Sequence, residues 1–262
     1  MKKITKKDLA DNPIKRLACC LVLDTSYSMT GDPLMKLKEG LKLFLDTILE
    51  NPKTNEKIQL AIVTFGHSDF SPKTPEGSRS PKEGVKQILD FDIDWRGMDV
   101  PNFSADGFTP LGEAVEFGLD LLLKQKEVYR ETSGTYEQPW MVIMTDGKPY
   151  DCQGITNKFG KYLHEFGGYV GIDENGKKVK NSISDIANET SELVSKEKLN
   201  LISVAIGDDA DPKIIKTFAP TNKVLKINNL NFSEFFRFFS ATLADPSQGY
   251  KPGEGIDVEE LL

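Results

Sequence analysis

The hydrophobic pattern of the chain alternates between short apolar runs and longer segments with a helical repeat. Apolar runs typical of strands buried on both faces occur at residues 17–23, 58–65, 140–145, 201–206 and 224–227. Between them, apolar residues recur every three or four positions, which predicts helices at residues 34–48, 109–123, 184–199, 214–218 and 232–243. This alternation predicts an α/β fold with a doubly wound, mostly parallel sheet and helices on both faces.

Two stretches interrupt the alternation. Residues 66–107 contain several Pro, Gly and Ser residues, and we expect a loop with one or two short elements there. Residues 150–182 include the turn signal DENGKK and suit an excursion from the fold. The rest predicts one domain over residues 17–245, after an N-terminal extension at residues 1–16 and before a mobile tail at residues 246–262.

Composition narrows the classes of function. The formal net charge of -7 argues against binding to nucleic-acid phosphates, which requires lysine and arginine. No apolar run approaches the ~18 residues that a membrane helix needs, and the N-terminus lacks the apolar stretch of an export signal. The odd set of Cys19, Cys20 and Cys152 lacks metal-binding spacing and suits reduced thiols. We therefore expect a cytoplasmic protein that binds neither nucleic acid nor membrane.

Oxygen-bearing side chains stand where strands end and where a helix begins. Asp24 ends the first strand, and Ser26 and Ser28 follow at alternate positions, so their side chains can point to one side. Thr109 opens a helix and Asp146 ends another strand. Ligands bind at such strand ends in doubly wound sheets, and hard cations such as Mg²⁺ prefer oxygen ligands. Each motif alone is more typical of a cap or a turn, but together they favour a metal site.

These motifs resemble the metal-ion-dependent adhesion site (MIDAS) of the von Willebrand factor A domain. Its three parts are similar to DTSYS at residues 24–28, the threonine of DGFTPLGEAV, and TDG at residues 145–147. NPIKR before the first strand, VAIGDDAD at residues 204–211 and FFRFFSATL at residues 235–243 are similar to the bacterial YegL- and TerY-like branch. The resemblance implies a Rossmann-like fold with a six-stranded, mostly parallel sheet.

The resemblance also implies how the site works. Ser26, Ser28 and Thr109 would bind the cation directly, and Asp24 and Asp146 would often act through water. The implied cation is Mg²⁺, with Mn²⁺ or Ca²⁺ as alternatives. Because only two carboxylates are present, the ion stays electrophilic enough to attract an Asp or Glu of another protein. The implied function is a metal-dependent protein–protein interaction module, which family analogy connects with a bacterial stress response.

Two departures and two alternative functions accompany this interpretation. Tyr27 and Phe108 stand where the family often has glycine, so the approach to the ion is expected to be narrower or more aromatic. A magnesium-dependent phosphatase of the haloacid dehalogenase type would also use Asp24, as its nucleophile. That mechanism needs a general acid two residues later, where this chain has Ser26, so we expect no catalysis. The other alternative is a scaffold whose metal site is empty.

Overall fold

The computed structural model describes most of the chain. The described residues are 2–11, 14–66, 84–107, 109–132, 135–146, 163–165, 168–170, 183–207, 210, 212–218, 224–227 and 229–245. Phe108, the turn expected in the 150–182 stretch and the tail at residues 246–262 lie outside them.

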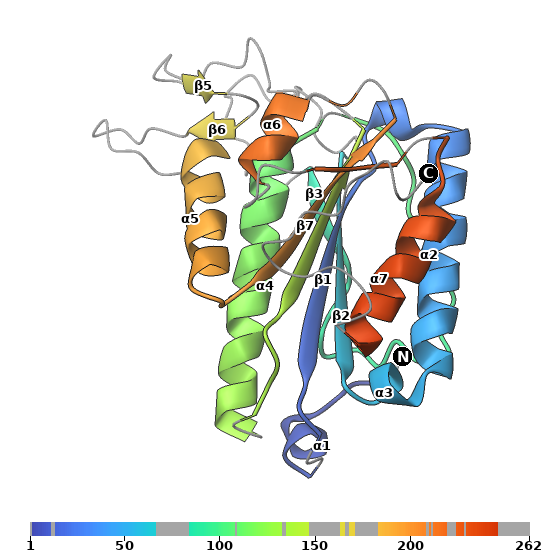
Figure 1. Ribbon diagram of the computed structural model, residues 1–262, viewed down its shortest axis with the longest axis vertical. Helices are drawn as coiled ribbons and strands as arrows, with labels where there is room; N and C mark the ends of the chain where they lie inside the picture. The colour runs from blue at the N-terminus through green and yellow to red at the C-terminus, as the bar shows by residue number, and fades with distance from the viewer. Residues whose placement is uncertain are drawn as a thin grey trace, which may run out of the picture.

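A six-stranded sheet forms the centre of the molecule (Figure 1), with the strand order β3-β2-β1-β4-β7-β8. Its strands are β1 (Leu17–Asp24), β2 (Ile58–Phe65), β3 (Val85–Leu89), β4 (Trp140–Thr145), β7 (Asn200–Ile206) and β8 (Leu225–Ile227). The pairing is parallel except between β2 and β3. From β1 the chain continues to β2 on one side and later to β4 on the other, so the strand order reverses between β1 and β4. The predicted doubly wound, mostly parallel sheet is confirmed.

Helices cover both faces of this sheet (Figure 1). They are α1 (Lys6–Ala10), α2 (Asp32–Glu50), α3 (Pro52–Asn55), α4 (Leu111–Thr132), α5 (Ile183–Ser195), α6 (Pro212–Thr217) and α7 (Phe232–Ala244). Helices α2 and α7 lie on one face, and α4 and α5 on the other. Successive β1 residues serve opposite faces, with Leu21 packing in the α2–α7 core and Val22 in the α4–α5 core. A continuous apolar run is required for such a strand.

The 66–107 stretch supplies the sixth strand, β3, which pairs antiparallel with β2 at one edge of the sheet. Helix α4 continues to Thr132, beyond the expected end at residue 123, because Gln125 and Tyr129 extend its buried stripe. Outside the main sheet, β5 (Leu163–Glu165) and β6 (Gly168–Val170) form an antiparallel pair. These elements were not predicted individually, since short or polar segments carry little periodic signal.

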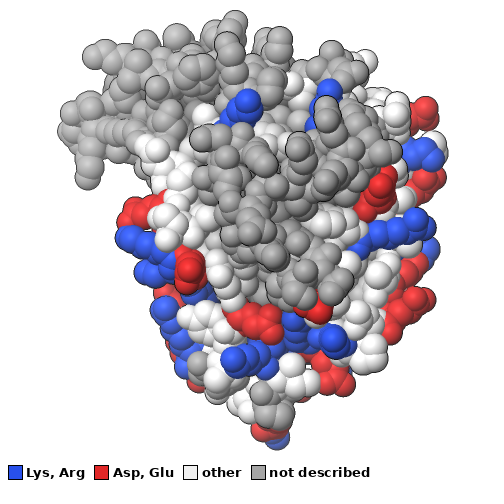
Figure 2. Space-filling model, viewed as in Figure 1, with Lys and Arg blue, Asp and Glu red and all other residues white. Residues whose placement is uncertain are grey.

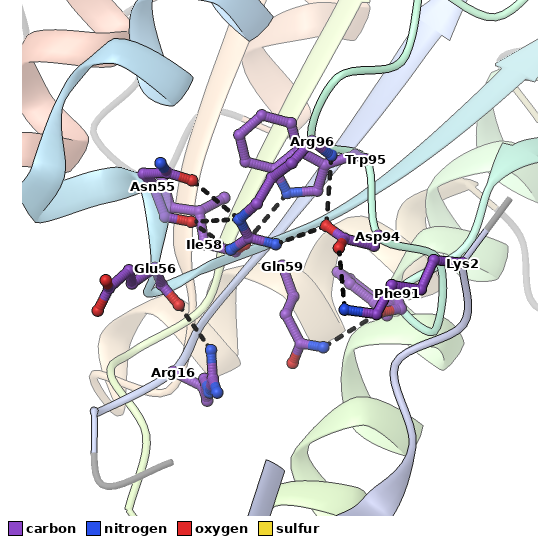
Figure 3. A network of polar contacts seen from close by, with 10 residues as sticks. All are labelled: Lys2, Arg16, Asn55, Glu56, Ile58, Gln59, Phe91, Asp94, Trp95 and Arg96. Carbon is purple, nitrogen blue, oxygen red and sulfur yellow. Dashed lines mark hydrogen bonds and ion pairs between the residues drawn. The ribbon is translucent and has the colours of Figure 1, made fainter. Parts of the chain in front are cut away.

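The amino ends of β1 and β2 hold a dense polar network (Figure 3). Arg96 donates from Nε to the Asn55 carbonyl at 2.8 Å and to Asn55 Oδ1 at 2.9 Å. Its Nη1 donates to Asp94 Oδ1 at 2.9 Å. Beside it, Trp95 Nε1 donates to the Ile58 carbonyl at 3.2 Å. This network ties the segment after β3 to the start of β2.

The described surface carries charges of both signs. Figure 2 shows lysine and arginine side by side with aspartate and glutamate over the described part of one face. Within the described ranges, no helix combines the length and apolar character that crossing a bilayer requires. The large apolar side chains exposed there are Tyr27, Met35 and Leu123.

Candidate metal centre

Asp24 is a fully buried carboxyl group at the carboxyl end of β1. Its Oδ1 accepts a hydrogen bond from the Ser26 amide at 2.8 Å. Its Oδ2 accepts one from the hydroxyl of Thr145, the last residue of β4, at 2.5 Å. The carboxyl group is therefore fixed across the β1–β4 pair, where the strand order reverses.

Three of the predicted side chains form a chain of hydrogen bonds from β1 to β4. The hydroxyl groups of Ser26 and Ser28 lie 3.0 Å apart, and Ser28 Oγ donates to Asp146 Oδ1 at 2.8 Å. Because Ser28 has a single hydroxyl proton, Ser26 is the donor between the two serines. With the bond from the Ser26 amide to Asp24, four of the five predicted residues belong to one network.

The loop after β1 is anchored through Thr25 and Met29. The amide and the hydroxyl of Thr25 both donate to the Phe65 carbonyl at the end of β2, each at 2.8 Å. A short 3₁₀ turn, η1 (Tyr27–Met29), follows, and the Met29 side chain is buried in the core. These anchors hold the loop in place without occupying the hydroxyl groups of Ser26 and Ser28.

Thr109 reaches the same end of the sheet from a second loop. The Asp106 amide donates to the Thr25 carbonyl at 3.0 Å, and the Tyr27 amide donates to the Gly107 carbonyl at 3.1 Å. Thr109 follows, buried, just before α4 begins. Among the described residues, no hydrogen bond joins its side chain to the other four predicted residues. The structure thus joins the loop that carries Thr109 to the loop after β1, and the role of Thr109 as a ligand stays a prediction.

Burial raises the pKa of Asp24 to about 7, and the nearby charge of Asp146 adds to the effect. The hydrogen bonds from Thr145 and Ser26 oppose this shift but do not cancel it. Asp24 forms no ion pair with a described lysine or arginine. Because Asp24 is buried near the negative charge of half-buried Asp146, a divalent cation would relieve the cost of ionising Asp24.

The donor set fits a hard divalent cation. It combines two carboxylates with three hydroxyl groups, all of them oxygen ligands of the kind that Mg²⁺ and Ca²⁺ accept. Within the described ranges, no group of three or more His, Cys, Asp and Glu side chains could hold a metal ion. A metal site at this position would therefore need the hydroxyl groups of Ser26, Ser28 and Thr109 in addition to its two carboxylates.

Two residues of this region were not predicted to contribute. Thr145 belongs to TDG, but its hydrogen bond to Asp24 depends on the pairing of β1 with β4, which no local pattern reveals. Asp106 is the second, and its position shortly before Thr109 in DGFTPLG is the sequence signal that points to it.

Solved structures with the same fold share little sequence with this chain. The pilus adhesin SpaC from Lactobacillus rhamnosus GG, in its open conformation, is 15% identical with a TM-score of 0.53, covering 93% of this chain and 31% of its own. Proximal thread matrix protein 1 from the mussel byssus, with a zinc-occupied MIDAS motif, is 16% identical with a TM-score of 0.51, covering 88% and 48%. The chain thus spans about half or less of these proteins.

A third structure matches over nearly its whole length. The vWF domain of the type V pili tip protein Mfa5 from Porphyromonas gingivalis is 11% identical with a TM-score of 0.50, covering 90% of this chain and 98% of its own. A search among curated proteins found no match.

The sequence model of the von Willebrand factor type A domain matches residues 20–240. This range covers most of the chain and includes the two loops and the strand end that carry the candidate site. Together with the sheet and its covering helices, the match settles the family predicted from the motifs. The chain belongs to the von Willebrand factor type A domain family.

Proposed function

We propose that this chain is a metal-dependent protein-interaction module. It holds one divalent cation, for which Mg²⁺ is the first candidate and Mn²⁺ and Ca²⁺ are the alternatives. The ligands are Asp24, Ser26, Ser28, Thr109 and Asp146. An Asp or Glu of another protein takes the remaining coordination position. When bound, the cation supplies a Lewis acid that attracts this outside carboxylate.

The hydrogen-bond chain from Ser26 through Ser28 to Asp146 carries the proposal. It brings oxygen atoms from two strand ends within hydrogen-bonding distance, although Ser28 and Asp146 are far apart in the sequence. Sites arranged in advance in this way bind with little cost of reorganisation. The anchoring of Thr25 keeps the two serines in this arrangement whether or not a ligand is bound.

Family membership supports the interaction role. Domains of this family generally mediate protein–protein interactions and are generally not catalytic. The mussel protein with zinc at its MIDAS motif illustrates that the fold can hold a divalent cation. In this chain Tyr27, at the tip of the loop between Ser26 and Ser28, is 74% exposed. An aromatic side chain of that kind suits contact with a partner.

The phosphatase alternative is not favoured by the observed geometry. Ser26 occupies the position where that mechanism needs a general acid, and its amide and hydroxyl are engaged with Asp24 and Ser28. A serine hydroxyl in such a network is a poor proton donor to a leaving group. We therefore propose a binding module and not an enzyme.

Calorimetry tests the metal site directly. EDTA-treated wild type is titrated with Mg²⁺ and with Mn²⁺, beside Asp24→Ala, Ser26→Ala and Thr109→Ala. We expect one-site binding in the wild type and its loss in the three variants. Ser195→Ala, on the exposed part of α5, is the matched control and should bind like wild type. Absence of binding to folded wild type would favour the empty-scaffold alternative.

A displayed peptide library tests the partner. Peptides are selected on the wild type in Mg²⁺ and released with EDTA. We expect the selected sequences to share an Asp or Glu whose replacement by Asn or Gln abolishes binding, and we expect Ser26→Ala to capture none of them. Metal-independent binding, or binders without a required acidic residue, would contradict the proposed mode of recognition.

The narrower assignment is also a proposal. We place the chain in the YegL- and TerY-like branch, acting in the bacterial cytoplasm in a stress response. The motifs at residues 204–211 and 235–243 support the branch, and the two buried free thiols of Cys19 and Cys20 suit a reducing compartment. Fractionation of the source cells tests the location. We expect to find the chain in the soluble cytoplasmic fraction, and its recovery elsewhere would contradict the assignment.

A further inference from the structure

Asp106, which lies shortly before Thr109, carries a buried oxygen atom that has no hydrogen-bond partner. This atom, Oδ1, is enclosed by the protein, and no donor in the described part of the chain reaches it. Buried carboxylate oxygens are normally paired, because removing them from water without a donor or a cation costs free energy. Such an unpaired acceptor indicates a missing cation, water or donor.

The backbone places Asp106 beside a predicted metal ligand. Two hydrogen bonds join its loop to the loop after β1, from the Asp106 amide to Thr25 and from the Tyr27 amide to Gly107. These bonds lie on either side of Ser26. Chains paired in this way lie about 4.8 Å apart, so Asp106 and Gly107 lie across from Ser26.

The conformation of Gly107 leads the same loop toward Thr109. Its φ of 75° lies in the left-handed region that glycine adopts readily. The chain therefore turns directly after Asp106 and continues to Thr109 at the start of α4. Asp106 thus lies across from one predicted ligand, Ser26, and shortly before another, Thr109.

We propose that Asp106 supports the cation from outside its set of direct ligands, by accepting a hydrogen bond from water bound to the ion. The inference rests on the proposed function, because it assigns a further residue to the same site. The direct ligands then still include only two carboxylates, so the ion keeps its attraction for an outside carboxylate. Groups that accept hydrogen bonds around the direct ligands strengthen metal binding, so Asp106 raises the affinity for the cation.

Calorimetric titration of the EDTA-treated full chain with Mg²⁺ tests this role. Asp106→Asn keeps the shape of the side chain and removes its charge. Asp99→Asn removes the same charge from an exposed residue of the same segment and is the matched control. We expect Asp106→Asn to weaken Mg²⁺ binding by about tenfold or more, the range known for residues that support metal ligands. The control should change affinity by less than about twofold, as expected for a screened surface charge.

Thermal unfolding separates a role toward the cation from a structural role. If Asp106 supports the cation, Asp106→Asn has an unchanged or higher melting temperature in EDTA, because its buried Oδ1 has no hydrogen bond that the substitution could remove. Its melting temperature then rises less than that of wild type when Mg²⁺ is added. A purely structural residue would lower the melting temperature equally in both conditions, and that result would overturn the inference.

The variants also separate this inference from the function on which it rests. If wild type binds Mg²⁺, Asp24→Ala does not, and Asp106→Asn binds like wild type, then only the role of Asp106 is wrong. If folded wild type binds neither Mg²⁺ nor Mn²⁺, both the proposed function and the role of Asp106 are wrong.

Discussion

At the amino ends of the strands, arginine side chains donate to backbone carbonyls, whereas at the carboxyl ends, acidic side chains accept from hydroxyl and amide groups. Arg96 donates to the Asn55 carbonyl and to Asp94, so its positive charge is paired within the protein (Figure 3). Among the described residues, Asp24 accepts from neutral groups of Thr145 and Ser26, and these bonds do not offset the burial that raises its pKa. We infer from this difference that the network at the amino ends of the strands stabilises the fold, whereas the acidic groups at the carboxyl ends can still bind a cation.

The largest effect should come from removing the buried charge at the carboxyl end. Burial and then Asp146 raise the pKa of Asp24 from 3.8 to about 7, so folded metal-free protein loses stability as pH rises from about 4 to about 7. Asp24→Asn removes this loss, which is on the order of 4 kcal/mol at most. In EDTA, the free energy of unfolding of Asp24→Asn minus that of wild type should increase from about pH 4 to about pH 7 and be constant above about pH 7.

Urea denaturation at several pH values measures this advantage, since the titration of other acids cancels in the difference. Saturating Mg²⁺ should stabilise wild type at pH 8 and leave Asp24→Asn unchanged. A difference that does not vary with pH would contradict the assignment of the titrating group.

The second effect concerns the amino end. Arg96→Ala removes the guanidinium group that donates to the Asn55 carbonyl and to Asp94, and should lower the free energy of unfolding by about 2 kcal/mol. Its affinity for Mg²⁺, measured by calorimetry on the folded protein, should equal that of wild type. Arg96→Lys keeps the charge but loses the planar fork, so it should recover only part of the stability. Loss of Mg²⁺ affinity in a stably folded Arg96→Ala would show that the two ends are coupled.

The smallest effect should come from a single hydrogen bond of the same network. Trp95→Phe removes the bond from Nε1 to the Ile58 carbonyl and should cost about 1 kcal/mol in the free energy of unfolding. Urea denaturation in EDTA and in Mg²⁺ should give the same loss, because Trp95 lies at the end of the sheet away from the candidate site. A loss seen only in Mg²⁺ would contradict this separation.

The central part of the fold could be predicted because its signals are local. The runs of β1, β2, β4 and β7 are continuous and apolar, as expected for strands covered on both faces. Strand β3 was predicted only as an unspecified short element of the 66–107 stretch, because only its end residues, Val85 and Leu89, are buried. Helix α4 was predicted too short because Gln125 and Tyr129 continue its buried face without an aliphatic pattern.

The site was predictable in outline and not in its contacts. The order of the motifs placed Asp24 and Asp146 at strand ends, and the pairing of β1 with β4 brings these ends together. The hydrogen bond from Thr145 to Asp24 and the unpaired oxygen of Asp106 arise from tertiary packing. Sequence spacing says nothing about such distances, so the metal-binding roles of the five residues stay predictions.

The double attachment of Thr25 to the Phe65 carbonyl has a kinetic consequence. Because the loop is already fixed through this residue and through buried Met29, no chain folding needs to accompany cation entry. The slow step should then be the release of water by the incoming ion, and Mg²⁺ gives up its water reluctantly. If the proposed site binds a cation, the rate of entry should follow the rate at which each ion releases its water, with Ca²⁺ faster than Mg²⁺, and not the motion of this loop.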